Sequence, residues 1–190
     1  MRVEERIMKA EEIYEKFGKV LLEDGEIRDL IKKLDSAIDR TKEYMRRIGV
    51  TEICRQCALE TGSCCKRWVE DEHDVSILLI NLLLGVELPK ERYREDLCFF
   101  CGEKGCRIKA REVICVTFLC DRIRERIGLE KEIELQKIAG EELELCFVLQ
   151  EKIKEKLRSL DYEPELGGGI LKHLHDFSVY VPRRLIGSNG

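Results

Sequence analysis

The sequence is poor in amide side chains: asparagine occurs only at positions 81 and 189, and glutamine only at positions 56, 136 and 150. Charged residues, in contrast, make up 38% of the 190 residues. Scarce amides beside abundant lysine, arginine and glutamate are typical of hyperthermophile proteins, so we expect a thermophile as the source. This expectation bears on the cysteines, because cytosolic disulfides are rare in mesophiles and common in hyperthermophiles.

Long hydrophobic runs are also missing, since no stretch approaches the roughly 18 to 20 apolar residues of a membrane-spanning helix. The longest apolar run, VSILLINLLLG from Val75, is too short and contains Asn81. The first residues, MRVEERIMKAEE, carry charges at helical intervals, whereas a signal peptide needs a continuously apolar core. These patterns predict a cytoplasmic protein with no membrane partner.

The chain has no excess of basic residues. Lysine and arginine total 34, aspartate and glutamate total 38, and the net charge is −4. Nucleic-acid-binding proteins need a basic surface to neutralise phosphates, so the composition argues against a nucleic-acid partner. The segment Lys66-Arg67-Trp68 leaves a small nucleic-acid alternative through base stacking, but packing is the simpler interpretation of Trp68.

The chain begins with two heptad seams, which are stripes of residues spaced alternately four and three positions apart. Mostly apolar residues recur at steps of four and three from Val3 to Leu21 and again from Ile27 to Ile48. Only Asp24-Gly25 separates the seams, which predicts an antiparallel helical hairpin. Gly49 follows the second seam, where a left-handed C-cap is favoured.

The rest of the chain also reads as helical. A long helix is predicted from about 129 to 160, with an apolar stripe wide enough to contact more than one neighbour. A short buried helix is predicted from Val75 to Leu84, ended by Gly85, and another from Pro89 to Leu97. The only candidate strand is 177–181, FSVYV.

The predicted fold class is therefore all-α, with a cysteine-rich insert in a helical bundle. The glycines at 167–169 are interpreted as a linker, because no Lys-Ser or Lys-Thr pair follows them as in a phosphate-binding loop. The expected organisation is a helical hairpin at 1–50, a cysteine-rich metal-binding module at 51–127, a long helix packing on the hairpin at 128–162, and an irregular tail at 163–190.

Nine of the ten cysteines lie between positions 54 and 120, in two clusters. The first cluster reads C-x2-C-x6-C-C and the second C-x2-C-x4-C-x8-C-x4-C. Two C-x2-C steps predict metal binding, because this spacing lets two thiolates converge on one ion. Cys146 has no thiol near it in the sequence and is interpreted as a buried apolar residue of the long helix. The candidate metal ligands are Cys54, Cys57, Cys64, Cys65, Cys98, Cys101, Cys106, Cys115 and Cys120.

The adjacent pair Cys64 and Cys65 constrains how the ligands divide. If both residues are helical, their side chains diverge by about 100°, so they can hardly serve one tetrahedral ion. Such divergence would suit two centres or a polynuclear cluster. Pairing within each sequence cluster and pairing across the clusters fit the spacing equally well.

The order and spacing of these cysteines resemble those of the CxxCxxCC family of zinc- or iron-chelating proteins. The match covers about a third of the chain and consists of Cys54, Cys57, Cys64, Cys65, Cys98, Cys106 within CRIKARE, and Cys115 and Cys120 within CVTFLC. The chain departs from the family pattern in a longer gap after Cys57, in Glu112 where proline usually follows the arginine, and in the extra Cys101, which could replace Cys98 as a ligand. The resemblance implies a metal site and no particular reaction.

The donor atoms narrow the choice of metal. The two clusters contain no histidine, which disfavours magnesium, calcium and iron-oxygenase sites and leaves zinc, iron, iron–sulfur clusters or Cu(I). Two ions of zinc or mononuclear iron, each held by four thiolates, would use eight of the nine cysteines. The alternatives are an iron–sulfur cluster, although the ferredoxin-type run is absent, and disulfides.

Three hypotheses for the function follow from these patterns. The first is a metal-binding protein with a zinc or iron site, and the second is an iron–sulfur redox or enzyme component. The third is a helix-mediated assembly protein, a homodimer or a complex with an unknown protein partner, in which zinc is purely structural. No catalytic residues can be named. His73 is interpreted as part of an acidic helix start. His173 and His175 are interpreted as solvated or capping side chains, with a metal-ligand role as the alternative.

Overall fold

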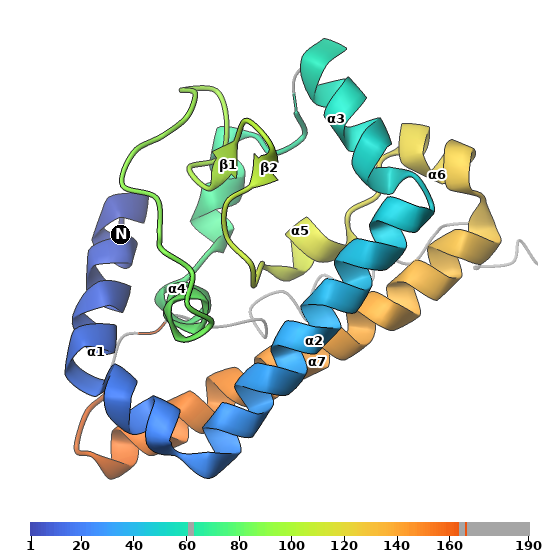
Figure 1. Ribbon diagram of the computed structural model, residues 1–190. Helices are drawn as coiled ribbons and strands as arrows, with labels where there is room; N and C mark the ends of the chain where they lie inside the picture. Colours follow the sequence, from blue (N-terminus) through green and yellow to red (C-terminus); the bar gives the residue numbers. More distant parts are fainter. Residues whose placement is uncertain (61–62, 164–165, 167–190) are drawn as a thin grey trace, which may run out of the picture.

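The computed structural model describes residues 1–60, 63–163 and 166, and these residues are mostly helical (Figure 1). Two short strands, β1 (Cys101–Gly102) and β2 (Gly105–Cys106), pair antiparallel. The predicted all-α class with a long C-terminal helix is confirmed. The helices are α1 (Val3–Glu23), α2 (Gly25–Arg47), α3 (Val50–Glu60), the 3-10 helix η1 (Arg67–Glu72), α4 (Val75–Leu83), α5 (Val113–Thr117), α6 (Asp121–Ile127) and α7 (Leu129–Ser159).

Local sequence signals set several helix ends. Asp24 ends α1 and caps α2, because its Oδ1 accepts hydrogen bonds from the N–H groups of Glu26 and Ile27 at 3.1 and 3.2 Å. These bonds satisfy two of the donors that a helix start leaves without partners. Gly49 and Gly85 follow α2 and α4 with φ values of +86° and +76°, the left-handed conformation that glycine adopts without strain.

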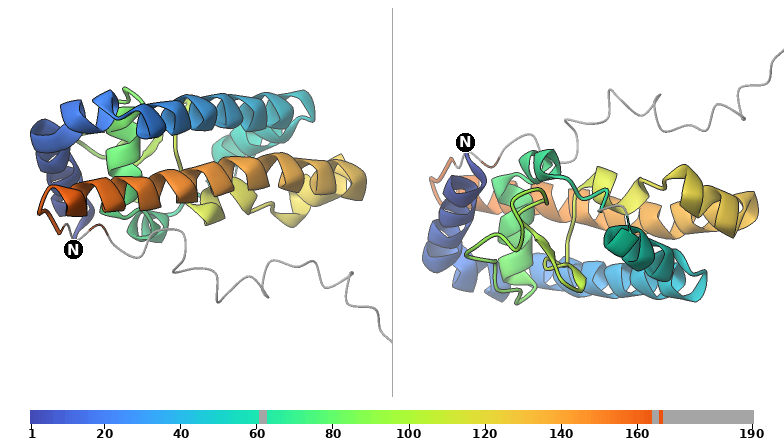
Figure 2. Two further views of the ribbon diagram at one scale, coloured as in Figure 1. Left: turned by 90° about the horizontal axis from the view of Figure 1, so that it is seen from below. Right: turned by 90° about the horizontal axis from the view of Figure 1, so that it is seen from above.

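The two N-terminal helices diverge from their shared turn (Figures 1 and 2). The long face of α2 packs against α7, which runs antiparallel to it, and α1 packs chiefly on α4. The helices α1 and α2 diverge because the apolar helix α4 packs against α1. Residues 77–80 of α4 are all 0% exposed and supply the surface that α1 covers. The expected hairpin is thus opened by α4, and the closely packed antiparallel pair is α2 with α7.

Two apolar cores support the cysteine-rich segments. The main core joins α1, α2, α4 and α7. A second core packs α6 against the end of α2 and the first turns of α7, through residues such as Tyr44, Ile123 and Leu135. The second core therefore fixes α6, against which α3 packs.

The helix predicted from Pro89 to Leu97 is wrong, since this segment is irregular. The Arg92 side chain reaches back to the Glu70 carboxylate at 2.8 Å and to the Leu97 carbonyl at 2.7 Å. Leu97 forms an antiparallel β-bridge with Lys66. These long-range bonds hold the backbone in a path that a helix could not follow.

Several predictions about the tail lie outside the described residues: the irregular tail beyond residue 166, the linker at 167–169, the strand at 177–181 and the interpretation of the histidines at 173 and 175. Over the ranges that are described, no helix combines the length and the apolar character needed to cross a membrane.

Candidate metal centre

The β-bridge between Lys66 and Leu97 joins the two cysteine clusters. Beside it, the Cys98 N–H donates to the Cys65 carbonyl at 2.9 Å. Neither Cys64 nor Cys65 is helical, so the divergence expected for a helical pair does not apply. The end of the first cluster therefore lies directly against the start of the second.

A buried ion pair holds the second cluster in this position. The side chains of Glu70 and Arg92 are only 8% and 9% exposed, and Glu70 also accepts a hydrogen bond from the Phe99 N–H at 2.9 Å. Burial alone would raise the pKa of Glu70, but the hydrogen bonds from Arg92 and Phe99 outweigh it and lower this pKa. The Glu70–Arg92 ion pair therefore fixes both residues that flank Cys98, because Arg92 binds the Leu97 carbonyl and Glu70 binds the Phe99 N–H.

The second C-x2-C step forms a tight turn that leads into a hairpin. The Cys101 N–H donates to the Cys98 carbonyl at 2.9 Å, which closes the turn. In the hairpin, Cys101 pairs directly with Cys106. The Arg107 guanidinium secures the hairpin by donating to the Glu91 carbonyl at 2.8 Å. Three cysteines are thus brought together by backbone geometry.

Asn81 anchors the segment that leads to Cys115. This amide is fully buried in α4, and its Oδ1 accepts from the N–H groups of Lys109 and Ala110 at 2.7 and 3.0 Å. Its Nδ2 donates to the carbonyls of Ile77 and Ala110 at 2.8 and 2.9 Å. The sequence signal for this role was a single amide within an otherwise apolar run, since a buried polar group needs partners.

Helices α3 and α6 position the remaining cysteines. Cys54 and Cys57 are three residues apart in α3 and therefore share one helix face. Cys120 is the N-cap residue of α6, which packs against α3. Accordingly, Cys54 interacts electrostatically with both Cys57 and Cys120.

The electrostatic neighbours divide the thiols into two groups that meet at Cys65. We call Cys54, Cys57, Cys64 and Cys120 the α3 group, and Cys98, Cys101, Cys106 and Cys115 the hairpin group. Cys65 interacts with Cys54 and Cys64 of the first group and with every member of the second. The division crosses the sequence clusters, because Cys120 lies with the first cluster and not with the second.

Cys65 is the thiol best prepared to ionise. Hydrogen bonds from the thiols of Cys101 and Cys64 hold the pKa of Cys65 below its usual range, and the same bonds raise the pKa of both donors. Burial raises the pKa of Cys98 to about 12. Since thiolates are the species that bind metals, Cys65 is a candidate ligand at the place where the two groups meet.

Arg111 supplies positive charge to this region. Its guanidinium interacts electrostatically with Cys54, Cys65, Cys106 and Cys115, in each case favouring the thiolate. Its Nε and Nη2 atoms are buried, and in the described part of the chain neither has a hydrogen-bond partner. A cation placed in this way compensates the negative charge of clustered thiolates.

Cys146 lies apart from both groups. It is 2% exposed in the main core, on α7, as predicted for a buried apolar residue. Its electrostatic neighbours are the carboxyl groups of Glu112, Glu142 and Asp74.

His73 is the residue at this site that sequence reasoning missed. Asp74 does cap α4, as expected for an acidic helix start, but His73 is 1% exposed and turned inward. Its Nδ1 hydrogen-bonds the Val69 carbonyl at 3.2 Å, and its Nε2 lies 3.9 Å from the Cys115 sulfur. No local sequence signal connects the two residues, which are 42 positions apart.

The donor set suits a soft metal, but the described side chains do not form a closed coordination sphere. All ten cysteines lie within the described ranges and all are free thiols, so the disulfide alternative gains no support. Within those ranges, no three His, Cys, Asp or Glu side chains are arranged to hold a metal ion. Metal binding would therefore require rotations of the thiol side chains, and the ligand assignment stays a prediction.

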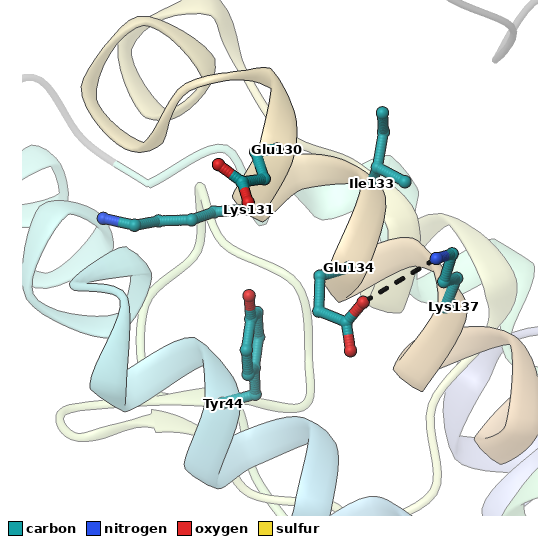
Figure 3. Close-up of a pocket in the computed structure, with 6 residues that line it drawn as sticks. All are labelled: Tyr44, Glu130, Lys131, Ile133, Glu134 and Lys137. Carbon is teal, nitrogen blue, oxygen red and sulfur yellow. Dashed lines mark ion pairs between the residues drawn. The ribbon is translucent and has the colours of Figure 1, made fainter.

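A surface hollow lies elsewhere, between Tyr44 of α2 and the first turns of α7 (Figure 3). Its walls carry both signs of charge, including an ion pair between Glu134 and Lys137 at 3.9 Å, and no cysteine lines it.

No family model matches the chain, and neither a curated protein nor a solved structure with significant similarity was found. The resemblance to the CxxCxxCC family therefore rests on the cysteine pattern alone.

Proposed function

We propose that this protein binds zinc or iron through its clustered cysteine thiolates, without inorganic sulfide. The observation that carries the proposal is the gathering of nine cysteines, from segments as distant as α3 and α5, into two groups that meet at Cys65. Buried thiols repel one another once ionised, so a set this dense is costly unless a cation compensates it. A divalent metal is the cation that sulfur ligands favour.

Three further features support metal binding. Arg111 stabilises thiolates in both groups, which is the protonation state that a metal requires. The Glu70–Arg92 ion pair and the Asn81 amide hold the ligand segments without using sulfur. The proposal also places the protein in the cytoplasm, and the ten cysteines, all free thiols in the described ranges, are available as ligands. Bound ions would tie α3 and α6 to the hairpin.

Metal analysis of protein purified without air tests the proposal. We expect bound zinc or iron with no acid-labile sulfide. Cys57→Ser in the α3 group and Cys106→Ser in the hairpin group should each lower the metal content, while the matched control Cys146→Ser should leave it unchanged. Equal metal loss from all three variants, or a wild-type protein that binds neither metal, would reject the assignment.

A second candidate is an iron–sulfur protein. It is favoured by the hydrogen-bonded contacts of Cys65 with both Cys64 and Cys101, because three neighbouring sulfurs suit a polynuclear cluster. The same preparation distinguishes the two candidates. Brown protein, with broad absorbance in the blue and sulfide equal to iron, would support the cluster and exclude the sulfide-free site.

A further inference from the structure

His73 is held in one orientation by contacts that leave a single nitrogen facing the thiols. A carbonyl oxygen can only accept, so the 3.2 Å contact with Val69 assigns the ring proton to Nδ1. In the neutral ring, Nε2 then carries the lone pair. The ring also packs on Phe100, with centroids 4.8 Å apart, which restricts its rotation.

This arrangement is the one that metal-binding histidines use. Such a histidine donates its other ring N–H to a carbonyl or carboxylate, which fixes the tautomer and the direction of the ligating nitrogen. Here the carbonyl of Val69 accepts that N–H, and Nε2 points to the sulfur of Cys115. The feature is independent of the cysteine spacing, because it comes from the η1–α4 connection.

The separation between the two donor atoms also fits a shared ion. With zinc–nitrogen and zinc–sulfur bonds of about 2.0 and 2.3 Å and a tetrahedral angle, two ligands of one zinc ion are about 3.5 Å apart. The observed Nε2–Sγ distance is 3.9 Å, so a shift of a few tenths of an ångström would bring both atoms onto one ion. Cys106, Cys65 and Cys98 are the thiols that interact with Cys115 and can complete the sphere.

Charge favours one nitrogen ligand at this position. Four thiolates around a divalent ion leave a net charge of −2, whereas three thiolates and a neutral imidazole leave −1. Cys115 is part of a hairpin group whose members already interact unfavourably with one another. Replacing one thiolate by imidazole lowers that repulsion inside the protein.

We propose that His73 is a metal ligand, and that the hairpin group forms a mixed nitrogen–sulfur centre in which Nε2 of His73 and Sγ of Cys115 bind the same ion. The inference rests on the proposed function and adds a ligand that the cysteine pattern does not contain. A second ion in the α3 group would be bound by sulfur alone.

The test uses the full chain, reduced and free of metal, loaded anaerobically with zinc for X-ray absorption and with cobalt(II) for optical spectra. His73→Phe removes the nitrogens and keeps an aromatic ring against Phe100. The matched control is the double variant His173→Ala/His175→Ala, which removes the other two histidines of the chain. Wild type and the control should both show nitrogen in the zinc coordination shell, and His73→Phe should show sulfur only.

Cobalt(II) gives a second readout. His73→Phe should weaken cobalt binding at one centre by at least about tenfold, the smallest loss typical of groups that support metal ligands. His73→Cys should restore part of the binding, since a fourth thiolate adds negative charge, and should shift the ligand-field bands to lower energy, as expected when sulfur replaces nitrogen.

The outcomes separate this inference from the proposed function. A wild-type protein that binds metal with sulfur ligands only, or a nitrogen signal that disappears in the tail variant and persists in His73→Phe, would overturn the role of His73 alone. A wild-type protein that binds neither zinc nor cobalt would overturn both. The zinc spectra of the wild type and of the His173→Ala/His175→Ala variant decide the matter even if His73→Phe fails to fold, because His73 is the one histidine left in that variant.

Discussion

Asn81→Leu should be among the most damaging single substitutions in this protein. Leucine has the same number and branching of side-chain heavy atoms but cannot make the four hydrogen bonds of the amide. Of its four backbone partners, the Ile77 carbonyl lies within α4, and the other three lose the amide outside any helix: the N–H of Lys109 and both the N–H and the carbonyl of Ala110. Ala110 is 1% exposed, so water cannot readily replace the lost partners there, while Lys109 is partly exposed.

The expected loss in the free energy of unfolding follows from these three backbone groups. A buried polar group left without a partner costs about 1 to 3 kcal/mol. Because Lys109 can regain some hydration, we expect a total loss of about 3 to 5 kcal/mol. A typical domain has a free energy of unfolding of about 5 to 15 kcal/mol, so the loss is a large fraction of it.

Urea unfolding of the metal-free protein, followed by circular dichroism in a chelating buffer, measures this loss directly. The control is Gln136→Leu, because the Gln136 amide donates one hydrogen bond, to the Thr117 carbonyl at 3.1 Å. We expect the control to lose about 1 kcal/mol. If Asn81→Leu cost no more than this control, the amide would not be the anchor of the 109–115 segment.

Three further predictions concern the core and the helix connections. Burial raises the pKa of Glu142, so the stability that this residue contributes is present below the usual carboxyl pKa and is lost as the pH rises. Glu142→Gln should therefore unfold at a higher urea concentration than wild type at pH 7 and at nearly the same concentration at pH 4. Equal urea midpoints at pH 7 would contradict this cause. Glu70→Gln should cost about 3 to 5 kcal/mol, because it leaves the buried Arg92 charge without its carboxylate. Asp96→Asn, in an exposed ion pair, is the control and should cost less than about 1 kcal/mol in the same urea assay. Gly128→Ala should lower the free energy of unfolding by about 1 to 3 kcal/mol, measured by thermal unfolding. Gly128 joins α6 to α7 at φ +78° and ψ 162°, a conformation that essentially only glycine adopts. An unchanged melting temperature would show that the connection adapts to alanine.

The sequence predicted the helices well where the signals were local. The seams ending at Leu21 and Ile48 match α1 and α2 closely, because helical periodicity depends on residues three and four positions apart. It could not predict which helices pack together, since α4 arrives between α1 and α2 from later in the chain. The error from Pro89 to Leu97 has the same origin: the partner of Arg92 is Glu70, 22 residues away.

The candidate site shows the same limit. The spacing of the cysteines predicted nine candidate ligands and excluded Cys146. It could not show that Cys120 lies near Cys54, because their proximity depends on the packing of α3 against α6. It also could not connect His73 with Cys115, since their approach depends on where η1 and α5 lie. Residue chemistry is readable from sequence, whereas the meeting of distant residues requires the fold.

The bridge between Lys66 and Leu97 has a consequence for metal exchange. It closes the loop between the two cysteine clusters, and that loop is anchored by α4 in an apolar core shared with α1, α2 and α7. The entropic cost of bringing the two cysteine clusters together is therefore offset by helix packing. In a zinc finger, by contrast, the bound ion offsets this cost. Under the proposed metal binding, an ion would be able to leave and return while the helices stay folded, and the exposed residues Cys54, Cys64 and Cys106 would give a competing thiol access to it.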